Sequence, residues 1–226
     1  MDLDGGVSHG TVADGIELLE NLEHRGTTGA DEGTGDGAGI MLQTPHDFFA
    51  DEVEDLPEAG EYAVGSLFMP QDADEAAGLQ DLVESVLADH GLDVFAWREV
   101  PTDNSELGRT ATESEPAVVQ CFVRSDLDDD AFDRALYVGR RDLENTIEER
   151  RPDGSGRFYV CSLDRDTVVY KGLLTAEQLP AYYPELEDER VKSVFAMVHA
   201  RFSTNTLGAW HLAHPYRNII HNGEFN

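Results

Sequence analysis

Two long amphipathic helix patterns alternate with short apolar strand patterns, and this alternation limits the folds open to the chain. The helices are predicted over residues 72–90 and 129–150, where large apolar side chains recur at helical spacing. Strands interleaved with such helices fit two packed sheets flanked by helices, which is an α+β class of fold. The predicted strands cover residues 40–44, 62–70, 94–100, 117–124, 158–163, 167–174 and 194–198.

Three local predictions follow from shorter patterns. A helix is expected to begin at Thr11, with Asp14 placed as in a capping box, and to end at Gly26. The strands at 158–163 and 167–174 are expected to form a hairpin around an acidic turn. The apolar run that precedes His199 is expected to be a buried strand.

The balance of charge is strongly acidic, with 16 basic residues against 46 acidic ones and a formal net charge of −30. Such a surface repels nucleic acid and anionic membranes, so neither is expected as a partner. The acidic residues are spread along the chain, which favours adaptation to a halophilic, high-salt environment. A Ca²⁺-binding or DNA-mimicking protein is the alternative. Because no signal peptide or membrane-spanning stretch is recognised, a cytoplasmic location is expected.

Several sequence patterns resemble ligand-binding motifs, but each lacks a feature that the motif requires. The acidic run at 126–130 lacks the Gly and Glu of an EF-hand loop and is predicted to be a solvated helix start. The glycine-rich loop at 26–39 follows a helix and leads into a strand, which is the reverse of a dinucleotide fingerprint. His211 and His214 have zinc-ligand spacing, but no cysteine or carboxylate cluster accompanies them.

Two polar motifs near the end of the chain suggest a binding and reaction site. Arg201 follows a strand, and a fixed guanidinium binds a carboxylate through paired, planar hydrogen bonds. Asn222 precedes Gly223, and an amide beside a glycine N–H is how an oxyanion hole is built. Together they suggest a site for an amino acid whose side-chain carbonyl is attacked. Taken singly, each motif fits a surface arginine or an Asn-Gly turn better.

The motifs His-Ala-Arg-Phe-Ser-Thr at 199–204 and His-Asn-Gly at 221–223 resemble the active-site segments of class II glutamine amidotransferases. These enzymes are N-terminal-nucleophile hydrolases, and the resemblance implies their four-layer αββα sandwich. It also implies that Arg201 holds the α-carboxylate of glutamine while Thr204 assists. By the same resemblance, Asn222 and Gly223 form the oxyanion hole, and Arg25 has an auxiliary role beside the nucleophile.

Longer stretches resemble the glutaminase domain of glutamate synthase large subunits. They lie at residues 18–26, 34–40, 45–49, 100–108 and 169–180. The resemblance implies hydrolysis of L-glutamine to glutamate and ammonia, with the ammonia passed to 2-oxoglutarate for reduction. It implies FMN and an iron–sulfur cluster in the parent protein and no cofactor in this chain. The implied partners are the rest of the synthase chain and a small subunit or ferredoxin.

The nucleophile of the family is an N-terminal cysteine, whereas this chain starts with Met1. Cys121 and Cys161 each lie in an apolar strand pattern and are expected to be reduced core residues. Residues 1–226 are therefore expected to be a partial amidotransferase domain without the nucleophile strand and the C-terminal part, inactive alone. The alternatives are a non-catalytic glutamine-binding regulatory module and another class II amidotransferase.

Overall fold

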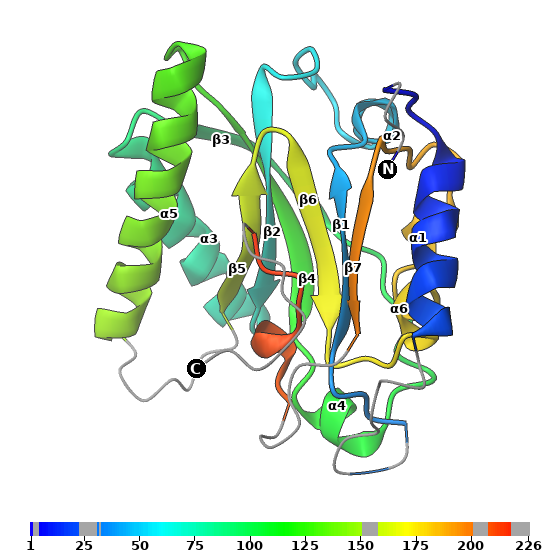
Figure 1. Cartoon of the computed structure of the whole chain (residues 1–226). Helices are drawn as coiled ribbons and strands as arrows, with labels where there is room; N and C mark the ends of the chain where they lie inside the picture. The colour runs from blue at the N-terminus through cyan, green and yellow to red at the C-terminus, as the bar shows by residue number, and fades with distance from the viewer. Residues whose placement is uncertain (2–4, 23–30, 32, 151–157, 201–207, 218–226) are drawn as a thin grey trace. The chain divides into compact units, whose positions relative to one another are not determined.

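The computed structural model describes residues 1, 5–22, 31, 33–150, 158–200 and 208–217 (Figure 1). The chain forms two compact units, each assembled from segments that are far apart in the sequence. Unit 1 comprises residues 1–49, 101–115 and 169–226, and unit 2 comprises residues 50–100 and 116–168. Each unit has its own sheet, so the α+β prediction is confirmed.

Unit 1 is built on a three-stranded sheet in the order β6-β1-β7 (Figure 1). Strand β1 (Ala38–Gln43) pairs antiparallel with β7 (Ala196–Ala200), and β6 spans Thr167–Gly172. Helix α1 (His9–Asn21) packs on this sheet at Gly15, where an added Cβ would lie 2.5 Å from the Cβ of Ala196. The shorter helices are α2 (His46–Glu52), α4 (Arg109–Glu113), α6 (Gln178–Tyr182), η2 (Pro184–Glu187) and η3 (Trp210–Leu212).

Unit 2 is built on a four-stranded antiparallel sheet in the order β3-β4-β2-β5. Helices α3 (Ala73–Ala88) and α5 (Asp129–Arg150) share a hydrophobic core with residues of these strands. Every residue of β2 is buried, so neither face of that strand is open to solvent. The strands are β2 (Tyr62–Met69), β3 (Asp93–Glu99), β4 (Ala117–Arg124) and β5 (Tyr159–Asp164).

The two long helices match their predicted ranges closely. The side chain of Asp72 caps α3 by accepting a hydrogen bond of 2.9 Å from the backbone N–H of Glu75. Gly91 follows α3 with φ of 75°, a conformation that glycine adopts readily after a helix. The acidic run at 126–130 does start a helix, and the carboxylate of Asp128 accepts from the N–H of Ala131.

The predicted start of the first helix is wrong by two residues. Helix α1 begins at His9 because Ser8 is its cap, with Oγ accepting from the backbone N–H of Thr11 at 3.2 Å. Serine is as good a cap as threonine, so the sequence pattern alone favours neither register. The helix ends at Asn21, earlier than predicted, and Gly26 lies outside the described residues.

The predicted hairpin is also wrong, because its two strands belong to different sheets. Strand β5 pairs with β2, whereas β6 lies beside β1. The turn between them is tight, since one carboxylate oxygen of Asp164 accepts from the N–H groups of Asp166 and Thr167, both at 2.9 Å. A tight turn between two apolar strands is typical of a hairpin, but it also allows a corner at which the chain changes sheets.

A strand is confirmed in this region, but β7 covers Ala196–Ala200 rather than 194–198, and it is not buried. All five of its residues are half-buried, and among the described strands β7 lies at one end of its sheet, paired with β1. Helices α2 and α4 were not predicted; both are short.

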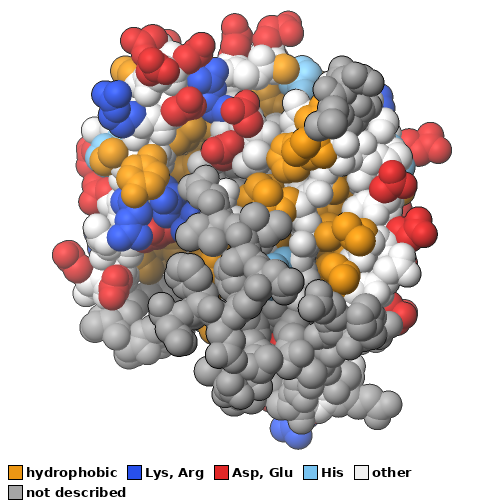
Figure 2. All heavy atoms as spheres, viewed as in Figure 1, with side chains coloured by type: hydrophobic (Ala, Val, Ile, Leu, Met, Phe, Trp, Pro, Cys, Tyr) orange, Lys and Arg blue, Asp and Glu red, His pale blue; other side chains and the backbone are white. Residues whose placement is uncertain are grey.

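Acidic side chains are scattered over the face shown in Figure 2, and basic ones are sparser there. This distribution agrees with the formal net charge of −30. Within the described ranges, none of the helices is long and apolar enough to cross a bilayer.

The close approach of backbone at Gly35 gives a stability prediction. A Cβ added there would overlap the backbone of Leu174, whereas a Cβ on Gly78 in α3 meets nothing within 4 Å. Gly35→Ala should therefore destabilise the chain by about 3 kcal/mol or more. Gly78→Ala, the matched control, should stabilise α3 by about 0.5–1 kcal/mol. Urea unfolding of both variants tests this, and equal midpoints would contradict the packing described at Gly35.

Candidate active site

The five residues predicted to bind and hydrolyse glutamine all lie outside the described residues. The structure does describe the two segments that lead to four of them. Strand β7 ends at Ala200, directly before Arg201, and residues 208–217 precede Asn222 and Gly223. What the structure shows of the candidate site is therefore the geometry of these two segments. The undescribed residues are Arg25, Arg201, Thr204, Asn222 and Gly223.

Three residues form a row across the sheet of unit 1 at the end where β7 leads to Arg201. Gly39 of β1 pairs with His199 of β7. Strand β6 lies on the side of β1 away from β7, and a Cβ added to Gly39 would lie 2.6 Å from the Cβ of Lys171 in β6. The row is therefore Lys171, Gly39 and His199, one residue from each strand.

A segment of backbone lies across this row, and we call residues 211–216 the crossing segment. The carbonyl oxygen of its His214 lies so close to the place where a Cβ of Gly39 would be that a side chain at Gly39 would overlap it. The His214 ring lies 4.4 Å from the His199 ring, with Nδ1 of His214 3.3 Å from Nε2 of His199. The crossing segment thus contacts both β1 and β7.

Lys171 binds the crossing segment from the third strand. Its Nζ donates to the carbonyl oxygens of His211 at 3.0 Å and Ala213 at 2.8 Å. The same ammonium lies 5.1 Å from the centre of the Tyr216 ring, which is within range of a cation–π interaction. Lys171 is only 1% exposed, and these contacts offset the cost of burying its charge.

The pKa of His211 is lowered, first by partial burial of its ring and second by the positive charge of Lys171. Because the folded pKa lies below the unfolded one, the unfolded chain takes up this proton first. The contribution of His211 to stability is therefore complete above the unfolded pKa of about 6.5 and is lost as the pH falls through the folded pKa.

An NMR titration of the histidine ring protons tests this contact. His211 should titrate with a midpoint below about 6.5. Lys171→Met should move that midpoint upward because the neighbouring positive charge is removed. The chain's other lysine, Lys192, lies near Asp47, and Lys192→Met should leave the midpoint unchanged. If the titration midpoint of His211 is the same in Lys171→Met as in the wild type, the described position of the Lys171 ammonium is contradicted.

The described part of the glycine-rich loop is held by hydrogen bonds within unit 1. The Gly33 carbonyl accepts from the side chain of Gln178 and from the N–H of Gly108, both at 2.8 Å. The carboxylate of Asp31 accepts from the hydroxyls of Thr34 and Thr110, and these bonds lower the pKa of Asp31. This loop enters β1 at Ala38, opposite Ala200, so it reaches the same end of the sheet as the exit of β7.

A buried network supports η3, whose last two residues are the first two of the crossing segment. Trp210 is a core residue, and its indole N–H donates to the carbonyl of Ala111 at 3.1 Å. Glu115 is buried and accepts from the hydroxyl of Tyr182 and the amide of Asn104, both at 2.9 Å. Burial, with Glu115 nearby, raises the pKa of Tyr182, so this hydroxyl stays a donor.

Both cysteines are buried in unit 2, as predicted, and neither forms a disulfide. Cys121 lies in β4 and Cys161 in β5. Burial raises the pKa of the Cys121 thiol to about 12, so its reactive thiolate form is negligible at neutral pH. Their positions fit core packing rather than catalysis.

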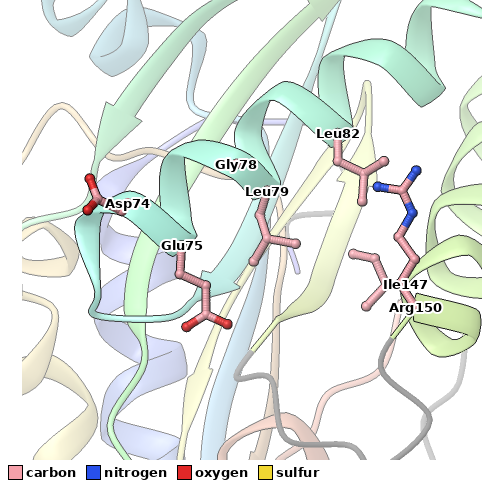
Figure 3. A pocket seen from close by; sticks show the side chains of 7 residues that line it. All are labelled: Asp74, Glu75, Gly78, Leu79, Leu82, Ile147 and Arg150. Carbon is pink, nitrogen blue, oxygen red and sulfur yellow. The ribbon is translucent and has the colours of Figure 1, made fainter.

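A groove of about 270 Å³ lies between α3 and α5 in unit 2 (Figure 3). Its floor is apolar, with Leu79, Leu82 and Ile147, and charged side chains stand at its margins. In the part of the chain that the structure describes, no group of three His, Cys, Asp or Glu is arranged to bind a metal.

Sequence reasoning missed the roles of Lys171, His199 and His214 around the crossing segment. One signal was available, because Lys171 is one of two lysines in a chain whose other basic residues are arginines. The pairing of His199 with Gly39, and the passage of His214 over that glycine, depend on contacts distant in sequence.

Residues 1–226 match the family described as glutamine amidotransferases class-II. The chain is 43% identical over 229 residues to the large chain of a glutamate synthase [NADPH] from Bacillus subtilis. It is 42% identical over 234 residues to a glutamate synthase [NADH] from Schizosaccharomyces pombe. It is 39% identical over 231 residues to ferredoxin-dependent glutamate synthase 1 from Arabidopsis thaliana.

These relatives are much longer than the chain. The three alignments cover 99%, 98% and 100% of this chain but 15%, 11% and 14% of the respective relatives. The chain therefore resembles one part of a glutamate synthase, and it does so in relatives whose names contain NADPH, NADH and ferredoxin.

Proposed function

Because the chain belongs to the class II glutamine amidotransferase family, we propose that it is the glutamine-hydrolysing domain of a glutamate synthase large chain. The observation that carries this proposal is the match along essentially the whole chain to synthases named for NADPH, NADH and ferredoxin. A part common to all three fits the step that they share, which is the release of ammonia from glutamine.

We infer that the two units together form the four-layer αββα sandwich of the N-terminal-nucleophile hydrolases. The family match supports this fold. The two sheets, each with helices packed on it, also fit this fold.

In the proposed reaction, Arg201 binds the α-carboxylate of glutamine through a bidentate pair, with Thr204 assisting. A cysteine thiolate attacks the side-chain carbonyl carbon, and the α-amino group of that cysteine takes the thiol proton. The oxyanion that forms accepts hydrogen bonds from the Asn222 amide and the Gly223 N–H. Arg25 is assigned an auxiliary position near the nucleophile.

The C–N bond then breaks, and the leaving nitrogen takes the proton from the α-amino group to depart as ammonia. Water attacks the resulting thioester, which releases glutamate and restores the thiol. Neither Cys121 nor Cys161 suits this role, because both are buried in unit 2 and neither has a free α-amine. The nucleophile is therefore assigned to a cysteine beyond these 226 residues, with residues 1–226 as part of the domain.

The ammonia would be used elsewhere in the longer protein, in a reductive reaction with 2-oxoglutarate. The rest of the synthase chain, with a small subunit or ferredoxin, would be the partners of this domain. FMN and an iron–sulfur cluster are proposed for the parent protein only. A cluster needs about four thiolate ligands, and two buried cysteines in β4 and β5 do not fit that requirement.

Release of glutamate from glutamine tests the proposal in two preparations. The complete protein should release glutamate, and the 226-residue polypeptide should release none. Titration calorimetry with glutamine distinguishes the rival, a non-catalytic glutamine-binding module. Micromolar binding by a complete protein that never hydrolyses glutamine would favour that rival and reject the proposed function.

A further inference from the structure

The groove between α3 and α5 of unit 2 has an apolar floor that remains partly open to solvent (Figure 3). Leu79 and Leu82 of α3 and Ile147 of α5 line this floor. Leu79 is buried in the hydrophobic core of unit 2, whereas Leu82 and Ile147 are only partly buried against that core. Covering apolar surface that water still reaches is favourable, so the floor favours an occupant with apolar side chains.

The two ends of the groove carry opposite charges. Asp74 and Glu75 lie at one end, and Arg150 lies at the other (Figure 3). Among the described residues, neither the carboxylate of Asp74 nor the guanidinium of Arg150 has an ion-pair partner. An occupant with a basic side chain at the first end and an acidic one at the second is therefore complementary in charge.

Gly78, which lies between the two ends, is a second and independent feature. It is an exposed residue in the interior of α3, and an added Cβ would meet nothing within 4 Å. Glycine is a poor helix former, and no packing within the described residues requires one at this position. A glycine does allow the backbone of another segment to approach the helix closely.

The length of the groove indicates the kind of occupant. Asp74 and Leu82 are eight positions apart in α3, which is about 12 Å at 1.5 Å per residue. The ammonium and carboxylate of a free amino acid are attached to the same carbon atom, so such a ligand is too short to reach both ends. An amphipathic polypeptide segment reaches both, as in the recognition of helices by apolar grooves.

The size of the groove favours a segment of the same polypeptide over a separate protein. Stable interfaces between separate proteins bury roughly 1,200–2,000 Å² in total, far more than a groove of this size provides. A tethered segment binds at a high effective concentration and needs less contact area. The relatives have ample chain for such a segment, since the matched parts are 15%, 11% and 14% of their lengths.

We propose that the groove between α3 and α5 docks a segment of the complete protein that lies outside residues 1–226. This segment inserts apolar side chains over the floor, pairs a basic side chain with Asp74 and pairs an acidic side chain with Arg150. The inference rests on the proposed function, because it takes the chain to be one domain of a longer synthase chain. Docking at this groove holds unit 2 against the rest of that chain.

Site-specific photocrosslinking in the complete protein tests the proposal. A photoreactive diazirine amino acid in place of Leu82 should crosslink to one segment of the same polypeptide outside residues 1–226. Peptide mapping by mass spectrometry identifies this segment, which should carry apolar residues between a basic and an acidic one. The same photoreactive amino acid in place of Ala77, an exposed residue of α3 that does not line the groove, should not form this crosslink.

A pair of leucine variants tests the groove itself. In Gly78→Leu, the new side chain fills space that the segment would occupy, so the crosslink from position 82 should fall by about fivefold or more. Ala77→Leu adds the same side chain outside the groove and should leave the crosslink yield unchanged. Equal yields in the two variants would overturn the proposal. So would the absence of a crosslink, or one confined to residues 1–226, to a second copy of the chain or to a separate subunit.

The docking role and the proposed function fail in distinguishable ways. A wild-type complete protein that hydrolyses no glutamine would reject the proposed function, whatever crosslink forms. A complete protein that hydrolyses glutamine but forms no crosslink from position 82 would reject the docking role alone.

Discussion

Arg201→Ala in the complete protein should raise the KM for glutamine by about 30- to 1,000-fold. The reason is the loss of a bidentate pair with the α-carboxylate, which is worth on the order of 2–4 kcal/mol of substrate binding. Synthesis of glutamate from added ammonia should be unchanged, because ammonia bypasses the glutamine site. Steady-state kinetics with glutamine and then with ammonia as the nitrogen source provide the measurement.

Arg190 supplies the control for Arg201. Its guanidinium binds the carboxylate of Asp188 on the surface of unit 1, at 2.6 Å, and its side chain is 41% exposed. Arg190→Ala should change the KM for glutamine by less than about twofold, since such exposed pairs contribute little. Equal losses of glutamine- and ammonia-dependent activity in Arg201→Ala would mean that Arg201 is structural.

Asn222→Ala should lower kcat for glutamine hydrolysis by about 100- to 1,000-fold, with little change in KM. The side-chain amide is proposed to donate to the oxyanion, a charge that exists only after the carbonyl is attacked. Rapid-quench measurement of glutamate release at saturating glutamine isolates this step. Asn145, an exposed residue of α5, is the control, and Asn145→Ala should keep the wild-type rate. A KM effect without a kcat effect in Asn222→Ala would assign this residue to substrate binding instead.

Local patterns predicted the elements of the fold well. Helices α3 and α5 appear where apolar side chains recur at helical spacing, and β2 and β4 appear where apolar runs are bounded by turns. Each of these signals lies within one stretch of sequence. The pairing of strands does not, and the turn at Asp164 was therefore assigned to a hairpin although β5 and β6 join different sheets.

The same limit applies to the candidate site. The motifs around Arg201 and Asn222 were recognised from short segments, and the family match agrees with the class of enzyme that they suggested. The Lys171–Gly39–His199 row was not predicted, because its members come from three strands that are adjacent only after folding. A glycine such as Gly39 carries no sign in the sequence that backbone from residue 214 will cross it.

The most direct test of the account is to find which residue of the complete protein attacks glutamine. A glutamine analogue that carries a reactive diazoketone in place of the amide should alkylate the nucleophile, and peptide mapping by mass spectrometry should locate the adduct. We predict a single adduct on an N-terminal cysteine outside these 226 residues, suppressed by glutamine and formed more slowly in Arg201→Ala. An adduct on Cys121 or Cys161, or no glutamine-protected adduct, would contradict the account.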